Sequence, residues 1–541
     1  MSDNDVPDVR VPTPWARFAR WRPVRVVRAI GAVVVRWAEP SRDYRLTRWL
    51  VTRLLGVVYV FAFLGLVYQA LPLLGEHGLT PIGSYVDRMH TAGVTFWDVP
   101  SVFMWDASDT AILAWTYIGL AIAIAVLLGY ANLPMLLVLW AIYGSFERVG
   151  QTWFSFGWEI QLLETTVIVA ALAHPWDPRP LAARSPPVTA LVLLRWLTFR
   201  IMLGAGLIKM RGSACWTDLT CLDGHFETQP SPNPLSAVFH HMPHAVHALG
   251  VVFNHAVELV GPFCLFGPRR VRLIAAAAMA AFQLTLIASG NLAFLNWLTL
   301  VPILGCFDDD ALLAITPRRL RDVLRSRLHD RPARRGHRIW VACLAVVVAY
   351  KSVPVIENLC HHHQAMNRSY DRLELVNTYG AFGSVDMVRH ELVIEGTLDA
   401  DPTAATWHAY ELPCKPGDMA RRPCVLGPYH RRLDWLMWFA SMPEPRERAW
   451  QAYPWVFHLV YKLLDGDRTV RELFAVDPFD GQPPAWIRIR RFVYHLEPLG
   501  ADAWWTRDSE EEWLPPTDLR SDFLATVLAE FDWPSPSVYT P

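Results

Sequence analysis

The chain has 541 residues, of which 52% are hydrophobic and 19% are charged, with 50 Lys and Arg against 51 Asp and Glu. This length allows two or three domains, and the balanced charge gives no sign of the basic face that a nucleic-acid-binding protein needs. We therefore expect no nucleic-acid partner, and an apolar chain that still carries this much charge predicts a membrane part joined to a water-soluble part.

The first 49 residues carry ten Arg, and they lack the apolar core and small-residue cleavage site of a signal peptide. Within them, residues 15–37 alternate basic and apolar positions. This segment is either a helix lying on the membrane surface or a basic tail that follows the positive-inside rule, and the pattern does not separate the two.

Nine stretches from residue 50 onward are apolar enough to predict membrane-spanning helices, because a span needs about 20 mainly apolar residues. Two of them, 133–149 and 291–307, are short and could be re-entrant. We therefore expect seven to nine spans and favour nine. The stretches are 50–74, 110–129, 133–149, 158–174, 188–209, 245–266, 271–288, 291–307 and 338–356.

The distribution of Arg over the loops predicts the orientation, because Lys and Arg are enriched on the cytoplasmic side. Loop 308–337 contains eight Arg, whereas loop 75–109 contains one and loop 212–244 contains neither Lys nor Arg. With the Arg-rich N-terminus inside, nine spans place loop 308–337 inside and loops 75–109 and 212–244 outside. The last span then delivers the C-terminal part to the outside.

The predicted architecture is an α-helical polytopic membrane bundle followed by a soluble α+β domain. Its three parts are an Arg-rich cytoplasmic segment, a transmembrane bundle and an extracytoplasmic domain, at 1–49, 50–356 and 357–541. In the last part, alternating apolar residues predict strands at 390–397, 405–412 and 486–495, and helical patterns occupy 430–442 and 446–464.

Four of the eight cysteines form two candidate disulfides on the outer side, where an oxidising compartment allows such bonds to persist. Cys215 and Cys221 share one predicted outside loop, and Cys414 and Cys424 share the outside domain. Spacing alone does not determine connectivity, so both pairs are hypotheses. Cys360 precedes three histidines, but adjacent histidines have poor ligand spacing, and we expect no metal and no cofactor.

Several ionisable residues fall within predicted spans, where charge is costly and normally faces a partner or a cavity; they include Glu159, Glu164, Arg195, Arg200, Lys209, His255 and Glu258. At about 1.5 Å per residue, Glu159 and Lys209 lie at similar depth, and Glu164 lies near the depth of Arg200. These residues, with Glu258, form an intramembrane polar cluster that is either a set of structural ion pairs or a functional pocket. Arg200 and Lys209 are nine positions apart and point to opposite helix faces, so one site using both requires a deformed helix.

Long segments rich in Trp, Cys and Tyr resemble the lipase maturation factor family. They are 157–164 (GWEIQLLE), 195–234 (RWLTFRIMLGAGLIKMRGSACWTDLTCLDGHFETQPSPNP), 376–396 (VNTYGAFGSVDMVRHELVIEG) and 428–442 (PYHRRLDWLMWFASM). The resemblance implies a membrane protein that helps secreted lipases fold and assemble. Vertebrate members lie in the endoplasmic reticulum membrane, with a lumenal C-terminal domain that engages the clients.

Stretch 204–216 is also similar, more distantly, to the helical bundle of the vitamin K-dependent γ-carboxylase, in which the lysine matching Lys209 is a base. A lysine in an apolar pocket can do such chemistry, but one at a helix end can also snorkel to the headgroups. We commit no residue to catalysis.

Two functions follow from these observations. The first is a membrane-anchored factor that assists folding or assembly of exported proteins such as lipases; Trp407, Trp435 and Trp438 would contact such clients or, as we favour, form the core. The second is a membrane-embedded enzyme or a lipid- or quinone-binding protein with a polar pocket near Lys209. Only four of the 50 basic residues are Lys, a bias typical of GC-rich bacterial genomes, so the expected location is a bacterial plasma membrane with membrane lipids as neighbours.

Overall fold

The computed structural model describes residues 44–328, 331–442 and 451–533. The predicted amphipathic segment 15–37 lies outside this range. Within these described residues, six helical stretches are long and apolar enough to cross a membrane. They are α3 (Arg45–Leu74), α5 (Asp109–Leu128), α8 (Val188–Arg211), the continuous stretch His244–Cys264, α13 (Arg269–Ser289) and α17 (Arg335–Cys360). The stretch His244–Cys264 consists of α11 (His244–His255), the π-helical turn η4 (Ala256–Val260) and α12 (Gly261–Cys264).

The other three predicted spans form shorter helices, which are α6 (Leu133–Val149), α7 (Gly157–Leu172) and α14 (Leu295–Leu304). They have 17, 16 and 10 residues, fewer than a full crossing needs. The chain is thus a multi-pass membrane protein with several apolar helices, and the count of nine is not confirmed.

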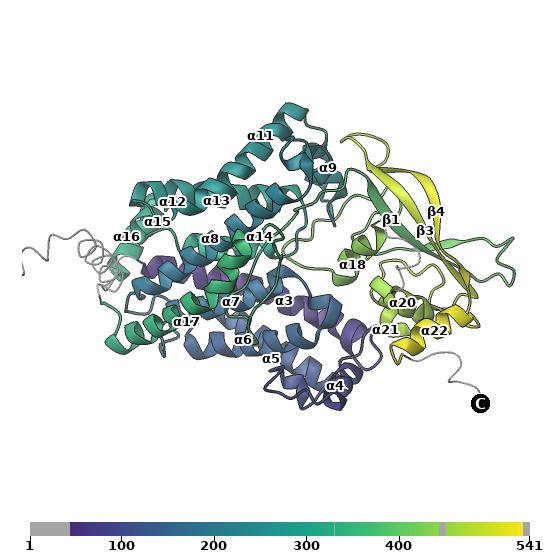
Figure 1. Ribbon diagram of the computed structural model, residues 1–541, viewed down its shortest axis with the longest axis horizontal. Coiled ribbons are helices and arrows are strands. Elements are labelled where there is room, and N and C mark those ends of the chain that lie inside the picture. The colour runs from purple at the N-terminus through teal and green to yellow at the C-terminus, as the bar shows by residue number, and fades with distance from the viewer. Residues whose placement is uncertain (1–43, 329–330, 443–450, 534–541) are drawn as a thin grey trace, which may run out of the picture.

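Helix α7 occupies the centre of the bundle, with all but one of its 16 residues buried. It packs against α6, α8 and α14, and α3 packs against α5 (Figure 1). A helix buried all round has no face on which a charged side chain can reach water. The two glutamates of α7 therefore need partners inside the protein.

Short helices lie at the two ends of the bundle (Figure 1). The Arg-rich α16 (Arg318–Arg327) and α15 (Asp309–Ile315) lie at the end far from the sheet, and α15 begins with the Asp308 side chain capping Ala311 N. At the opposite end, α9 lies close to the sheet. Other short helices are α4 (Ile82–Thr91), η1 (Val102–Met104), η2 (Gln151–Phe154), η3 (Ala214–Trp216), α9 (Cys221–Thr228) and α10 (Pro234–His240).

The C-terminal part is a four-stranded antiparallel sheet in the order β2-β1-β3-β4, with helices on one face. Three strands match the predicted ones, while β4 and α22 were not predicted. The strands are β1 (Arg389–Thr397), β2 (His408–Tyr410), β3 (Trp486–Leu496) and β4 (Trp505–Thr517). The helices are α18 (Arg432–Ser441), α20 (Pro454–Leu464), α21 (Arg468–Arg471) and α22 (Asp522–Glu530).

The linker between α17 and β1, residues 361–388, passes along α8 rather than through solvent. Gly204 within α8 and Gly212 at its C-cap permit this close approach. A Cβ atom at Gly204 would lie 2.4 Å from the Tyr379 carbonyl oxygen, and one at Gly212 would lie 2.0 Å from the Gly383 carbonyl oxygen. Since real side chains do not fit at these distances, glycine allows the linker to pack on the bundle.

Candidate functional site

Glu164 and Arg200 form an ion pair at the centre of the bundle, where their side chains are 0% and 1% exposed. The linker completes this pair. Arg200 Nη1 donates to the Asn377 carbonyl oxygen at 2.8 Å, and Glu164 Oε2 accepts from Asn377 N at 3.0 Å and from the Tyr379 hydroxyl at 2.6 Å. The buried pair is thus the docking point for the linker that leads to the C-terminal domain.

Glu159, one and a half turns earlier on α7, binds the C-terminal domain directly. Its Oε1 lies 2.8 Å from Arg432 Nη1 on α18, and its Oε2 accepts a hydrogen bond from the Tyr143 hydroxyl. Arg432 also donates to the Trp153 carbonyl oxygen, and its own backbone N donates to Gln69 Oε1 at 2.8 Å. Arg432 Nη2 also donates to the Tyr143 hydroxyl at 3.4 Å, so this arginine of the C-terminal domain is held by α3, α6, α7 and η2.

The third buried pair joins Lys209 on α8 to Glu258 in η4. Lys209 Nζ lies 2.7 Å from both carboxylate oxygens and 3.1 Å from Asn254 Oδ1. The Trp216 ring centroid is 5.1 Å from the same nitrogen, close enough for a cation–π contact. These contacts satisfy the ammonium group as a cation.

The five predicted residues, together with Arg432, therefore form three separate pairs rather than one cluster. The structure places Glu164 against Arg200, but the expected contact between Glu159 and Lys209 is wrong, because each of these residues binds another partner. Sequence reasoning missed Arg432, which stands with Arg431 and Asp434 among the aromatic and aliphatic residues of segment 428–442.

The contacts around Lys209 do not support a role as a catalytic base. A base needs a free lone pair, whereas this nitrogen is held by both oxygens of one carboxylate. The cavity beside it has a volume of about 140 Å³, smaller than the roughly 300 Å³ at which small-molecule sites begin. We assign Lys209 a structural role.

This assignment predicts that the Lys209→Met/Glu258→Gln double variant folds and keeps its function. Removing both charges of a buried pair is often close to neutral, whereas removing one leaves an uncompensated charge at a cost of about 3–5 kcal/mol. Thermal unfolding of the double variant and of each single variant measures this difference. Loss of function by a stably folded double variant would contradict the structural role.

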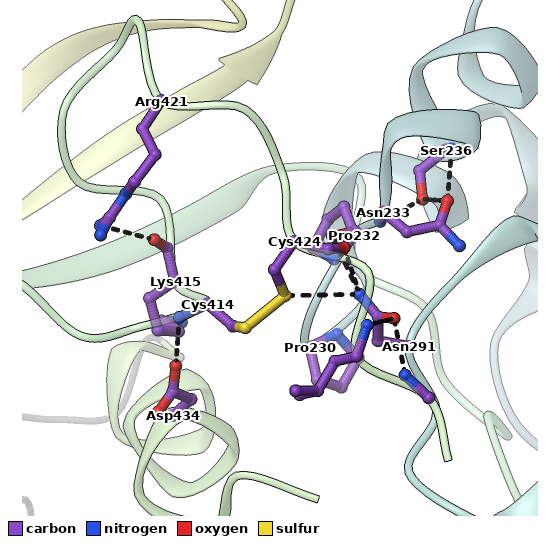
Figure 2. Close-up of a disulfide and its surroundings, with 12 residues drawn as sticks. Pro230, Pro232, Asn233, Ser236, Asn291, Cys414, Lys415, Arg421, Cys424 and Asp434 are labelled. Atoms are coloured by element: carbon purple, nitrogen blue, oxygen red, sulfur yellow. Dashed lines mark hydrogen bonds between the residues drawn. A yellow bond between two sulfur atoms is a disulfide. The ribbon is translucent and has the colours of Figure 1, made fainter. Parts of the chain in front are cut away.

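Both candidate disulfides are formed, joining Cys215 to Cys221 and Cys414 to Cys424. Figure 2 shows the second one beside Asn291, which lies in the loop between α13 and α14. Asn291 Nδ2 donates to the Cys424 carbonyl oxygen at 2.9 Å, and Asn291 Oδ1 accepts from the two backbone N–H groups that follow Val425. The disulfide loop is thus a third attachment between the bundle and the C-terminal domain.

Two buried charged groups lie beside this loop. Arg389 on β1 donates to the carbonyl oxygens of Glu227 and Gln229 at the end of α9, both at 2.6 Å. Lys415 lies 2.5 Å from Glu391, and burial lowers its pKa to about 8. Arg389, a cation at the C-terminus of α9, complements the helix dipole and fixes β1 to the end of the bundle near the sheet.

Asp434, also drawn in Figure 2, accepts a hydrogen bond from Cys414 N at 2.7 Å. Burial raises the pKa of its carboxyl from 3.8 to about 6. The folded protein therefore binds this proton more tightly than the unfolded chain does. The contribution of Asp434 to stability is most favourable below pH 4 and is lost as the pH rises through 6.

Asp434→Asn is expected to stabilise the protein at pH 7, by at most about 3 kcal/mol. The asparagine oxygen can still accept from Cys414 N, and the cost of a buried carboxylate disappears. The difference in unfolding midpoint between variant and wild type should grow from pH 4 to pH 7. Asp418→Asn, at an exposed position of the loop closed by the Cys414–Cys424 disulfide, is the matched control and should show no such growth.

The three tryptophans considered as client contacts have different environments. Trp435 is buried, 5% exposed, and belongs to the core, as we favoured. Trp407 is partly exposed and lies under the guanidinium of Arg488, 4.3 Å from the ring centroid. Trp438 is partly exposed, and its Nε1 donates to the Thr228 carbonyl oxygen at 2.9 Å.

Comparisons with known proteins agree with this architecture. Residues 46–314 match the lipase maturation factor transmembrane domain, and residues 375–515 match the lipase maturation factor C-terminal domain. Mouse Lipase maturation factor 1 is 42% identical over 526 residues, which cover 91% of this chain and 90% of the mouse protein. Human Lipase maturation factor 1 is 40% identical over 523 residues, with 91% of each chain covered.

A more distant relative, human Lipase maturation factor 2, is 29% identical over 611 residues, which cover 90% of this chain and 85% of the human protein. No solved structure matches the chain significantly. Because the similarity to Lipase maturation factor 1 spans both the bundle and the sheet domain, the chain belongs to the lipase maturation factor family.

Proposed function

We propose that this protein is a membrane-anchored factor that assists the folding or assembly of exported lipases. The observation that carries this proposal is the identity above 40% with a lipase maturation factor over nine-tenths of both chains. The buried contacts of Arg200, Arg432 and Asn291 support it, because they give the C-terminal domain a fixed position on the membrane bundle. A client bound by that domain would be held close to the membrane from which it emerges.

The proposed orientation has the N-terminus in the cytoplasm and the C-terminal domain outside, in a bacterial plasma membrane. Two observations support it: the Arg-rich helix α16 lies at the end of the bundle far from the sheet, and α9, which begins at the disulfide-bonded Cys221, lies close to the sheet (Figure 1). The second disulfide, Cys414–Cys424, belongs to the segment between β2 and α18. Alkaline phosphatase, which is active only outside, should be active when fused after residue 541. It should be inactive when fused within residues 308–337, the segment that contains α16, and the reverse pattern would contradict the orientation.

Deletion of the gene in the source organism tests the function. We expect exported lipase to lose specific activity per unit of lipase antigen, because unassisted chains misfold or fail to assemble. Re-expression of the wild-type chain should restore the activity. The proposal fails if the specific activity of every exported lipase is unchanged by the deletion.

A further inference from the structure

A cavity of about 530 Å³ lies where the bundle, the linker and the C-terminal domain meet. Its walls come from α7, α8, α14, the linker and α18. Among the lining residues are Trp158, Gln161, Ala205, Ala381, Trp438 and Phe439. This volume falls within the range of ligand-binding sites. The cavity adjoins the smaller space beside Lys209, and the two share five lining residues: Ile201, Ala205, Leu295, Ala381 and Phe382.

The wall of this cavity is aromatic and preformed. Trp158 stacks on Phe156 with ring centroids 4.5 Å apart and meets Trp435 edge-on at 4.9 Å. Trp438 contacts Phe439 edge-on at 4.9 Å. Rings that are already packed against one another offer an apolar surface to a ligand without further loss of side-chain freedom.

The rim of the cavity is adaptable and uncharged. Met366 and Met442 supply flexible thioethers, the side chains that proteins use at surfaces accepting varied apolar partners. Exposed Ser155, Asn367 and Ser384 supply uncharged donors and acceptors. A peptide backbone, which carries one N–H and one C=O per residue, matches such groups.

The lack of charge in the described lining argues against a phospholipid, the competing occupant of this cavity. None of the described residues that line the cavity is charged. A phospholipid would place its phosphate at the rim, where phosphate oxygens require Arg, Lys or several N–H donors. An apolar peptide segment makes no such demand.

We propose that this cavity binds a short, uncharged segment of an exported polypeptide, one that presents aromatic and aliphatic side chains before it is buried in the client's own fold. This inference rests on the proposed function and gives it a binding site. The site would recognise the unfolded character of a client, through apolar side chains in the cavity and backbone amides at the rim.

Peptide binding to the full-length protein in lipid nanodiscs tests the proposal. The probe is a fluorescein-labelled peptide of alternating Phe, Leu, Ser and Gly, read by fluorescence anisotropy, with a matched peptide in which Ser replaces Phe and Leu. Ala381→Phe fills the cavity from the linker and should weaken binding of the apolar peptide by at least about tenfold. Ala420→Phe makes the same chemical change at an exposed position of the disulfide loop and should leave binding unchanged.

A second variant, Ser384→Trp, blocks the exposed rim without entering the core and should weaken binding if Ala381→Phe disturbs folding. Equal affinity of the wild type and both blocking variants would overturn the proposal. So would phospholipid that copurifies in stoichiometric amount with the wild type and is lost from Ala381→Phe. If Ala381→Phe loses peptide binding but still supports lipase maturation, the cavity is not the site through which clients are assisted, while the proposed function stands.

Discussion

Arg200→Met is expected to destabilise the protein by about 3–5 kcal/mol and to release the linker from the bundle. In this variant Glu164 keeps its hydrogen bonds from Asn377 N and Tyr379 but loses its counter-charge in a place with no access to water. The Asn377 carbonyl oxygen loses its donor as well. Both losses act on the same segment, so the linker should open before the rest of the structure unfolds.

Limited trypsin digestion measures this opening, because Arg368 and Arg372 are exposed cleavage sites within the linker. Cleavage at these two residues should be faster in Arg200→Met than in the wild type when opening is in rapid equilibrium. Arg195→Met removes a partly exposed arginine from the same helix and should leave the cleavage rate unchanged. The Glu164→Gln/Arg200→Met variant should recover part of the lost stability, since no unpaired buried charge remains. Equal linker cleavage in the wild type and all three variants would refute the role of the Glu164–Arg200 pair in docking the linker.

The sequence was sufficient to place most helices and three of the four strands, because their apolar patterns are strong. It failed at β4, where Asp508 and Glu510 to Glu512 interrupt the alternation expected of a strand. Those acids are compatible with a strand because the neighbouring β3 supplies Arg490 and Arg491, which pair with Glu510 and Glu511. A cross-strand partner of opposite charge overrides the local pattern, and a pattern read along one segment does not include it.

The height of each residue along its helix explains both the correct and the wrong pairing in the bundle. Rise per residue fixes the height of a side chain along a helix, and it brought Glu164 to the level of Arg200 correctly. It does not fix the direction in which the side chain points. Glu159 turns away from Lys209 toward Arg432, which lies 273 residues later in a segment predicted to belong to a separate soluble domain. Sequence patterns carry no information on how two such parts dock, so the anchoring role of these charges required the structure.

Arg432→Met is expected to loosen the C-terminal domain from the bundle and to lower the free energy of unfolding by about 3–5 kcal/mol, because it leaves the buried Glu159 without a counter-charge. The guanidinium reaches Glu159, the Trp153 carbonyl oxygen and the face of the Phe154 ring at 3.7 Å. Arg432→Lys keeps the charge but not the planar fork that serves several partners, and we expect an intermediate loss.

Hydrogen exchange followed by mass spectrometry locates the effect. Amides of α18 and η2 should exchange faster in Arg432→Met, while those of β3 stay protected, because the sheet keeps its own hydrogen bonds. Arg431→Met is the matched control: the neighbouring arginine is partly exposed and lies 5.8 Å from the Tyr429 ring centroid. If exchange in α18 rises equally in both variants, Arg432 is an ordinary helix residue. If it rises only in Arg432→Met and falls again in Glu159→Gln/Arg432→Met, the charge on α7 is the anchor that holds the C-terminal domain on the membrane bundle.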